Sequence, residues 1–171
     1  MSNSIKRPYS EMIIIAEEIK ALLEPHVFRI EIAGSLRRKK DLVGDIEIIL
    51  ISKPFETGLF ATGLAEIVDQ WQMIVGSLDK HCKYTKRIFK GVQVDLFFCE
   101  FDNWGNTLAV RTGSADYSFK VLASGWKQAG YFSKDNYLYQ YGNENKIILR
   151  EEKDLFNLIG VEYVEPEKRN L

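Results

Sequence analysis

The sequence predicts an α+β fold, because one amphipathic helix and several strand patterns occur in the same chain of 171 residues. In the segment Tyr9–Leu23, apolar side chains recur at the spacing of one helical face. Asp45–Ile51 is rich in β-branched residues and indicates a strand. Two more strands, Lys83–Phe89 and Val92–Cys99, are expected to form a hairpin that turns at Lys90-Gly91.

The remaining elements divide the chain into two predicted domains, residues 1–104 and residues 105–171. In the first, we expect a half-buried strand at 28–32, a turn at Gly34-Ser35 and a helix around 63–71. In the second, we expect a short helix, a longer helix at 115–129, a hairpin through 141–143 and a last helix from about 151 to 160. The second segment reads as a separate small lobe.

Composition places the chain among folded proteins. Hydrophobic residues make up 46% and charged residues 27%, and the net charge of −1 gives no global positive field for nucleic acid. Cys82 and Cys99 are too few for a disulfide framework, so we expect free thiols. With no signal peptide and no apolar run long enough to span a membrane, we expect a soluble, cytoplasmic monomer without a membrane partner.

Three acids form the most informative pattern in the sequence. Asp45 and Glu47 share one face of a predicted strand because side chains alternate with a period of two, and Asp95 lies in a second strand. If the strands are adjacent, three carboxylates could hold two Mg²⁺ ions, which prefer oxygen ligands. The alternative is that these acids are solvated at strand ends and that Asp95 pairs with a base such as Arg87.

A glycine-rich basic segment precedes the acids. The run Gly34-Ser35-Leu36-Arg37-Arg38-Lys39-Lys40 offers backbone N–H groups, a hydroxyl and guanidinium groups, and Gly44 adds a second small residue directly before Asp45. These are the groups that bind the phosphates of a nucleoside triphosphate. A basic run alone is usually a solvated face. It becomes informative here because a strand with the pattern Gly-Asp-x-acid follows it closely.

Five ordered motifs together resemble the catalytic core of the family X DNA polymerases. They are Gly34-Ser-x-Arg-Arg, Gly44-Asp-Ile-Glu, Val94-Asp95-Leu96, Thr112-Gly113-Ser114 and Tyr163-x-x-Pro166-x-x-Arg169. The resemblance runs from about Ile30 to the C-terminus. It implies a nucleotidyltransferase palm in residues 1–104, a mixed β-sheet with helices on one face, followed by a small α/β thumb subdomain in residues 105–171.

The resemblance also implies roles for particular residues. Asp45 and Glu47 would bridge two Mg²⁺ ions, and Asp95 would bind the catalytic ion and help to deprotonate the primer 3′-hydroxyl. The implied nucleotide-binding residues are Gly34, Ser35, Arg38, Gly44, Thr112, Gly113 and Ser114, with a cis peptide joining the last two. The implied DNA-binding residues are Arg37, Lys120 and Arg169. The substrates would be a dNTP and a primer–template or gapped DNA, in gap filling or repair.

Several features depart from the family pattern. Glu47 stands where the family has the shorter Asp, which makes a preference for Mn²⁺ or a reduced activity plausible. The residues before Gly34 are too few for an additional DNA-binding domain, so we expect the smallest, palm-plus-thumb architecture. The alternatives are transfer without a template, transfer to RNA, protein or a small molecule, and a catalytically degenerate nucleic-acid-binding module. The tyrosines at 131, 137, 139 and 141 could stack on bases or pack in a core.

Overall fold

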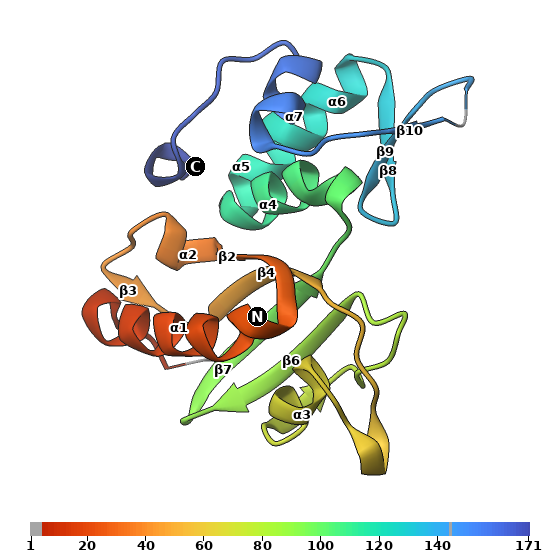
Figure 1. The fold of residues 1–171 in the computed structure, drawn as a ribbon. Helices are drawn as coiled ribbons and strands as arrows, with labels where there is room; N and C mark the ends of the chain where they lie inside the picture. Colours follow the sequence, from red (N-terminus) through yellow and green to blue (C-terminus); the bar gives the residue numbers. More distant parts are fainter. Residues whose placement is uncertain (1–4, 144) are drawn as a thin grey trace. The chain divides into compact units, whose positions relative to one another are not determined.

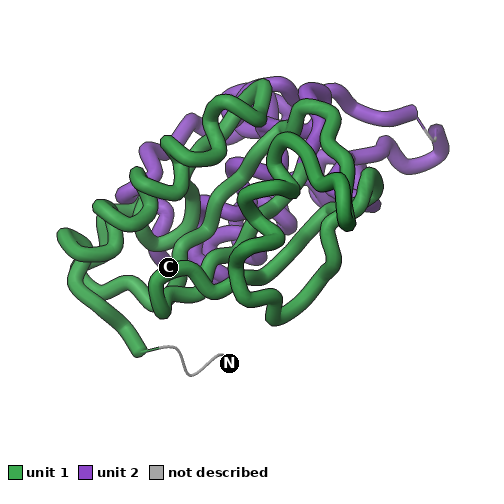
Figure 2. The backbone as a smooth tube through the Cα atoms, turned by 60° about the horizontal axis from the view of Figure 1, so that its bottom comes forward, with its two compact units in different colours: residues 1–98 green, residues 99–171 purple. Residues whose placement is uncertain are grey.

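The computed structural model describes residues 5–143 and 145–171 and divides the chain into two compact units. Unit 1 ends at Phe98 and unit 2 begins at Cys99 (Figure 2). The sequence prediction placed a domain boundary six residues later, after Trp104 (104 − 98 = 6). None of the helices in these described ranges is long and apolar enough to cross a membrane.

Unit 1 is built on a mixed five-stranded sheet with the strand order β2-β4-β7-β6-β5 (Figure 1). Neighbouring strands are antiparallel except β4 and β7, which are parallel, so the predicted α+β class with a mixed sheet is confirmed. Two short strands, β1 and β3, pair separately. The strands are β1 (Arg7–Pro8), β2 (Val27–Ile32), β3 (Leu42–Val43), β4 (Ile46–Ser52), β5 (Gln72–Val75), β6 (Tyr84–Phe89) and β7 (Val92–Phe98).

Helix α1 (Tyr9–Leu23) has the predicted bounds and supplies four fully buried residues to the core of unit 1. Its apolar stripe packs in one cluster with Ile46 and Ile48 of β4, because burial of that stripe removes the most apolar surface from water. The helix expected at 63–71 is shorter, α3 (Leu64–Val68). Helix α2 (Gly34–Arg37) and the 3₁₀ turns η1 (Glu24–His26) and η2 (Gly58–Phe60) complete unit 1.

The hairpin between β6 and β7 turns at the predicted residues. Lys90 and Gly91 both have positive φ values, 49° and 73°, as a two-residue hairpin turn of the type that matches strand twist requires. Phe89 is therefore paired with Val92, and every other pair of the two strands follows from that register. This turn fixes which β6 residues face Asp95.

Unit 2 packs helices against a three-stranded antiparallel sheet of order β10-β9-β8. The region expected to be one helix at 115–129 is helical throughout, but its middle turns are π-helical. There the hydroxyl of Ser124 donates to the carbonyl of Phe119, five residues earlier, at 3.2 Å. The helices are α4 (Trp104–Thr112), α5 (Ala115–Tyr117), the π-helix η4 (Ser118–Ala123), α6 (Ser124–Gln128) and α7 (Glu152–Leu158), with 3₁₀ turns η3 (Phe101–Asn103) and η5 (Pro166–Lys168); the strands are β8 (Tyr131–Lys134), β9 (Tyr137–Gln140) and β10 (Lys146–Ile147).

The core of unit 2 contains a buried ion pair. Arg169 is fully buried, forms an ion pair with Glu152, and donates from Nε to the carbonyl of Val164 at 2.8 Å. Its guanidinium also lies over the rings of Phe156 and Tyr163, at 5.0 and 5.1 Å from the ring centroids. A guanidinium enclosed in this way cannot contact DNA phosphates, so the expected DNA contact at Arg169 is corrected to a structural role.

We expect Glu152→Ala to lower the free energy of unfolding by about 3 to 5 kcal/mol, because it leaves the buried Arg169 guanidinium without its counter-charge. Urea unfolding of the full chain, followed by circular dichroism, measures the change. Asp116→Ala is the matched control, since it removes an exposed ion pair with Lys120 and should cost less than about 1 kcal/mol. Equal effects of the two substitutions would contradict the structural role of Arg169.

Candidate functional site

The three predicted acids lie on one face of the unit 1 sheet. Strands β4 and β7 are adjacent, and Glu47 is directly opposite Asp95 in their register. Asp45 directly precedes β4 and shares the face of Glu47, because they are two residues apart. Ile46 and Ile48 point to the opposite face and are fully buried in the core. The adjacency on which the metal-site prediction depends is therefore present.

Asp95 is the most enclosed of the three acids, with 8% of its surface exposed. Its Oδ1 accepts a hydrogen bond from the Tyr84 hydroxyl at 3.0 Å and lies 3.9 Å from the Lys86 ammonium. Lys86 stands directly opposite Asp95 on β6. Its partly buried cation offsets part of the cost of enclosing the carboxylate.

Asp45 and Asp95 share one hydrogen-bond donor. The side-chain nitrogen of Gln93 donates to Oδ2 of Asp95 at 3.2 Å and to Oδ2 of Asp45 at 3.4 Å. Burial raises the pKa of Asp45, and the negative charge of Asp95 raises it further, while Lys86 and Arg38 act in the opposite direction. The two carboxylates therefore converge closely enough to feel each other's charge.

Glu47 lies against the glycine-rich segment. The turn expected at Gly34-Ser35 is a single helical turn, α2, in which the Arg38 N–H donates to the Gly34 carbonyl at 3.2 Å. The correction has a physical reason, because burying Leu36 to 2% exposure in the core holds this turn on the sheet. Gly34 has a φ of +60°, and a side chain there would collide with the Glu47 carboxylate. Glycine is thus required where this backbone meets the acid.

Arg38 brings a cation to the same place. Burial lowers the pKa of its guanidinium, and the charges of Glu47 and Asp45 counteract that shift. Ser35 and Gly44, the other residues of this segment expected to bind phosphate, are half-buried and lie on either side of it in the chain. The structure therefore places the basic segment beside the acids, as a site for a triphosphate needs, while phosphate binding itself stays a prediction.

The fit of this site to a metal ion rests on its carboxylates. Asp45 and Asp95 offer the oxygen ligands that Mg²⁺ prefers, and they already share a donor, the Gln93 amide, that a cation could replace. Glu47 occupies the adjacent register position but contacts Gly34. Within residues 5–143 and 145–171, no three His, Cys, Asp or Glu side chains gather closely enough to hold a metal. Two of the predicted ligands thus form a pair, and the two-ion centre stays a prediction.

The predicted nucleotide-binding residues of unit 2 are engaged in its own structure. Thr112 is fully buried at the end of α4. The Ser114 hydroxyl accepts hydrogen bonds from the backbone N–H groups of Tyr117 at 3.1 Å and Leu171 at 3.2 Å, which caps α5. The resemblance implied a cis peptide between Gly113 and Ser114, but the described part of the chain contains only trans peptides. Here this turn caps a helix and anchors the C-terminal segment.

The other predicted DNA contacts differ in accessibility. Arg37 is half-buried at the end of α2 in unit 1. Lys120 is exposed in unit 2 and forms an ion pair with Asp116 at 3.3 Å, one helical turn away. Lys120 can therefore reach a solvent ligand, whereas the buried Arg169 cannot.

Three residues that surround Asp95 were not predicted from the sequence, namely Tyr84, Lys86 and Gln93. The signal was available, because a two-residue turn at Lys90-Gly91 fixes the register of β6 and β7. That register places Lys86 opposite Asp95. Gln93 then lies on the face of Asp95 because it precedes it by two residues.

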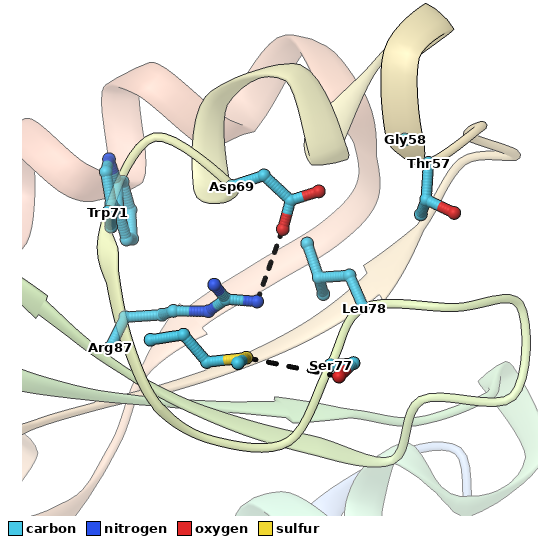
Figure 3. A pocket seen from close by; sticks show the side chains of 8 residues that line it. Thr57, Gly58, Asp69, Trp71, Ser77, Leu78 and Arg87 are labelled. Carbon is cyan, nitrogen blue, oxygen red and sulfur yellow. Dashed lines mark hydrogen bonds and ion pairs between the residues drawn. The ribbon is translucent and has the colours of Figure 1, made fainter.

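A separate pocket of about 470 Å³ lies elsewhere in unit 1 (Figure 3). It is built around Arg87, which is 3% exposed and contacts Asp69 at 3.3 Å and the Thr85 hydroxyl at 3.0 Å. The carboxylate that Arg87 contacts is Asp69, which also lines the pocket. The alternative that Asp95 pairs with a base therefore holds in part, because the base beside Asp95 is Lys86 and not Arg87. The lining consists of Thr57, Gly58, Asp69, Trp71, Met73, Ser77, Leu78 and Arg87.

Comparison with known proteins gives a class for unit 2. Residues 107–170 match the family model described as DNA polymerase beta thumb. Together with the α+β fold and the acid face of unit 1, this match supports a domain similar to those of family X polymerases.

Two curated proteins are similar over part of this chain. A DNA nucleotidylexotransferase of Ambystoma mexicanum is 28% identical over 85 residues, which is 50% of this chain and 17% of that protein. A DNA nucleotidylexotransferase of Monodelphis domestica is 24% identical over 101 residues, or 59% of this chain and 19% of that protein. The similarity thus spans about a fifth of the length of these relatives.

We expect Asp45→Asn to stabilise the protein at pH 7. Because burial and Asp95 raise the pKa of Asp45 in the folded state, its protonated form is favoured by folding, and that contribution is lost as the pH rises through the folded pKa. The gain from the neutral amide should therefore be present at pH 7 and shrink as the pH falls below the folded pKa of Asp45. Urea unfolding at several pH values measures it.

Asp41→Asn is the control, because it removes an exposed acid four residues away. Asp41→Asn should change the free energy of unfolding little at any of these pH values. A loss of stability in Asp45→Asn at pH 7 would contradict the assigned environment of Asp45.

Proposed function

We propose that this chain is a metal-dependent nucleotidyltransferase of the family X DNA polymerase type, which transfers a nucleotide from a dNTP to a primer 3′-hydroxyl in gap filling or repair. The observation that carries the proposal is the convergence of Asp45 and Asp95 on one donor, beside the Arg38 guanidinium. The match of residues 107–170 to a polymerase thumb supports the same class.

Asp45 and Asp95 would hold the divalent cation, and Glu47, in the register position next to Asp95, would be the third ligand. Bound Mg²⁺ or Mn²⁺ supplies neutralisation of phosphate charge and lowers the pKa of a coordinated hydroxyl. Binding of the cation would displace the Gln93 amide from between the carboxylates. The repulsion between Asp45 and Asp95 would then be relieved, which contributes to cation affinity.

The surrounding residues would position the substrates. Arg38, Ser35 and the Gly44 backbone offer the charged and neutral donors that the nucleotide phosphates require. Asp95 would accept the proton of the primer 3′-hydroxyl, whose oxygen forms a bond to the α-phosphorus as the bond to the departing pyrophosphate breaks. In unit 2, the turn 112–114 and the exposed Lys120 would contact the nucleotide and DNA.

Primer extension with Mg²⁺ or Mn²⁺ and a dNTP mixture tests the proposal. We expect Asp95→Asn and Asp45→Asn each to reduce nucleotide addition by on the order of 100-fold or more, because each removes a ligand charge needed in the transition state. Asp41→Asn, outside the site, should retain activity. Addition at wild-type rates by Asp95→Asn would overturn the proposal, provided circular dichroism shows that the variant is folded.

A second candidate is nucleotide transfer without a template, and similarity to two DNA nucleotidylexotransferases favours a DNA end as the acceptor. RNA, protein or a small molecule as acceptor belongs to the same group of alternatives. We expect a gapped duplex to be extended with the complementary dNTP faster than a single strand with any dNTP. The reverse order would favour the second candidate, and offering ribonucleotides and the other acceptors separates the rest.

A third candidate is a nucleic-acid-binding module that has lost catalysis. It is favoured by the position of Glu47, whose carboxylate meets Gly34 and does not join the other two acids. Calorimetric titration of the protein with a dNTP, with and without Mn²⁺, distinguishes this binding module from the two nucleotidyltransferase candidates. For the proposed function, we expect a heat of nucleotide binding that appears only with the metal and is lost in Asp45→Asn. For the third candidate, we expect no metal-dependent heat of nucleotide binding.

A further inference from the structure

The three-stranded sheet of unit 2 has two unlike faces. On one face, Tyr131, Leu138 and Ile147 pack into the core of the unit, and Leu138 is fully buried. Residues directly opposite in a sheet share a face, so the register assigns the side chains of the other face. That face would be expected to carry polar groups if it only met water.

The second face carries aromatic rings alternating with lysines. One cross-strand row runs from Phe132 on β8 through Tyr139 on β9 to Lys146 on β10, and the next row pairs Lys134 with Tyr137. The Nζ atom of Lys146 lies 4.1 Å from the centroid of the Tyr137 ring, which is a cation–π contact. The Tyr137 hydroxyl donates to the carboxylate of Glu100, which fixes this ring at the edge of the face.

Three aromatic rings on this face are in contact, with Phe132 between Tyr139 and the solvent-exposed Tyr141. The centroids of Phe132 and Tyr139 are 5.5 Å apart at an interplanar angle of 20°, and those of Phe132 and Tyr141 are 5.2 Å apart at 38°. Tyr141 lies just after β9, held by a bond from its N–H to the Gly130 carbonyl at 2.9 Å. It is 59% exposed, so its ring is available to a further planar group.

We propose that this surface, the ring face of Phe132, Lys134, Tyr139, Tyr141 and Lys146, binds single-stranded nucleic acid. A base would stack on the exposed ring of Tyr141, and the backbone phosphates would meet the two lysines. Aromatic rings beside cations are the combination by which proteins hold single strands without reading sequence. The proposal does not depend on nucleotidyl transfer, because none of these residues belongs to the acid face of unit 1.

The two cross-strand rows contain Lys134 and Lys146 and no acid, and one carboxylate, that of Glu100, meets Tyr137 at the edge of the face. The two lysines outnumber that carboxylate, so the rows complement a polyanion even though the whole chain has a net charge of −1. A neutral, apolar protein surface would remove water from Lys134 and Lys146 without supplying negative charges to pair with them, which is energetically unfavourable. The charge pattern therefore favours nucleic acid over an apolar partner.

Fluorescence anisotropy of a labelled oligothymidylate of about 15 nucleotides, titrated with the full chain without divalent cations or dNTP, tests the proposal. We expect Tyr141→Ala to weaken binding about tenfold, because one base loses its stacking partner. Tyr141→Phe should bind like the wild type, because stacking needs the ring and not the hydroxyl. Phe28→Ala is the matched control, since Phe28 has the same 59% exposure on β2 of unit 1.

Two further measurements locate the contact. Lys146→Gln should lower the slope of log affinity against log salt by about 0.7, the value for one phosphate contact in a single strand. Ultraviolet cross-linking of wild-type protein to an iodouracil-containing oligonucleotide should label Tyr141 or its ring neighbours, a readout that does not depend on the folding of any variant. Absence of oligonucleotide binding would overturn the proposal. Cross-links confined to unit 1, together with unchanged oligonucleotide affinity in Tyr141→Ala, would also overturn it. So would binding of a protein to this face when no oligonucleotide binds.

Discussion

The parallel pairing of β4 with β7 is the constraint on which the site depends. Along both strands, the residues on one face are fully buried aliphatic side chains, namely Ile46, Ile48, Val94 and Leu96. Because side chains alternate, burying this set forces Asp45, Glu47 and Asp95 onto the other face. A slip of one residue would drive carboxylates into the core, so the hydrophobic pattern that stabilises the sheet also positions the acids.

Gathering these acids on one face has an electrostatic cost, which neighbouring strands partly offset. Gln93 donates to two of the carboxylates, and Lys86 and Arg38 bring positive charge from β6 and from the segment after α2. The offset is incomplete at Asp45, whose pKa remains raised. Repulsion between neighbouring carboxylates, such as that between Asp45 and Asp95, destabilises the folded protein and is typical of functional sites.

The sequence predicted elements with strong local signals and missed those that depend on distant contacts. The bounds of α1 and the hairpin at Lys90-Gly91 were correct because apolar spacing and turn chemistry are local. The Gly34 segment is helical because Leu36 reaches a core made by other strands. The acids were found from their alternation. The burial of Arg169 was missed because a sequence shows a charge but not its enclosed partner, Glu152.

The two units differ in how their buried and partly buried charges are compensated. This difference distinguishes a structural ion pair from a candidate catalytic site. In unit 2, the charges of Arg169 and Glu152 are matched one to one, so the pair leaves no net charge, and the guanidinium also lies over the rings of Phe156 and Tyr163. In unit 1, three carboxylates on one face meet the two cations Lys86 and Arg38 and the neutral amide of Gln93. The compensation is incomplete at Asp45, because burial and the charge of Asp95 raise its pKa in spite of Lys86 and Arg38. A bound cation would favour the charged form of that carboxylate, which is why the acid face, and not the buried pair, is the place to look for catalysis.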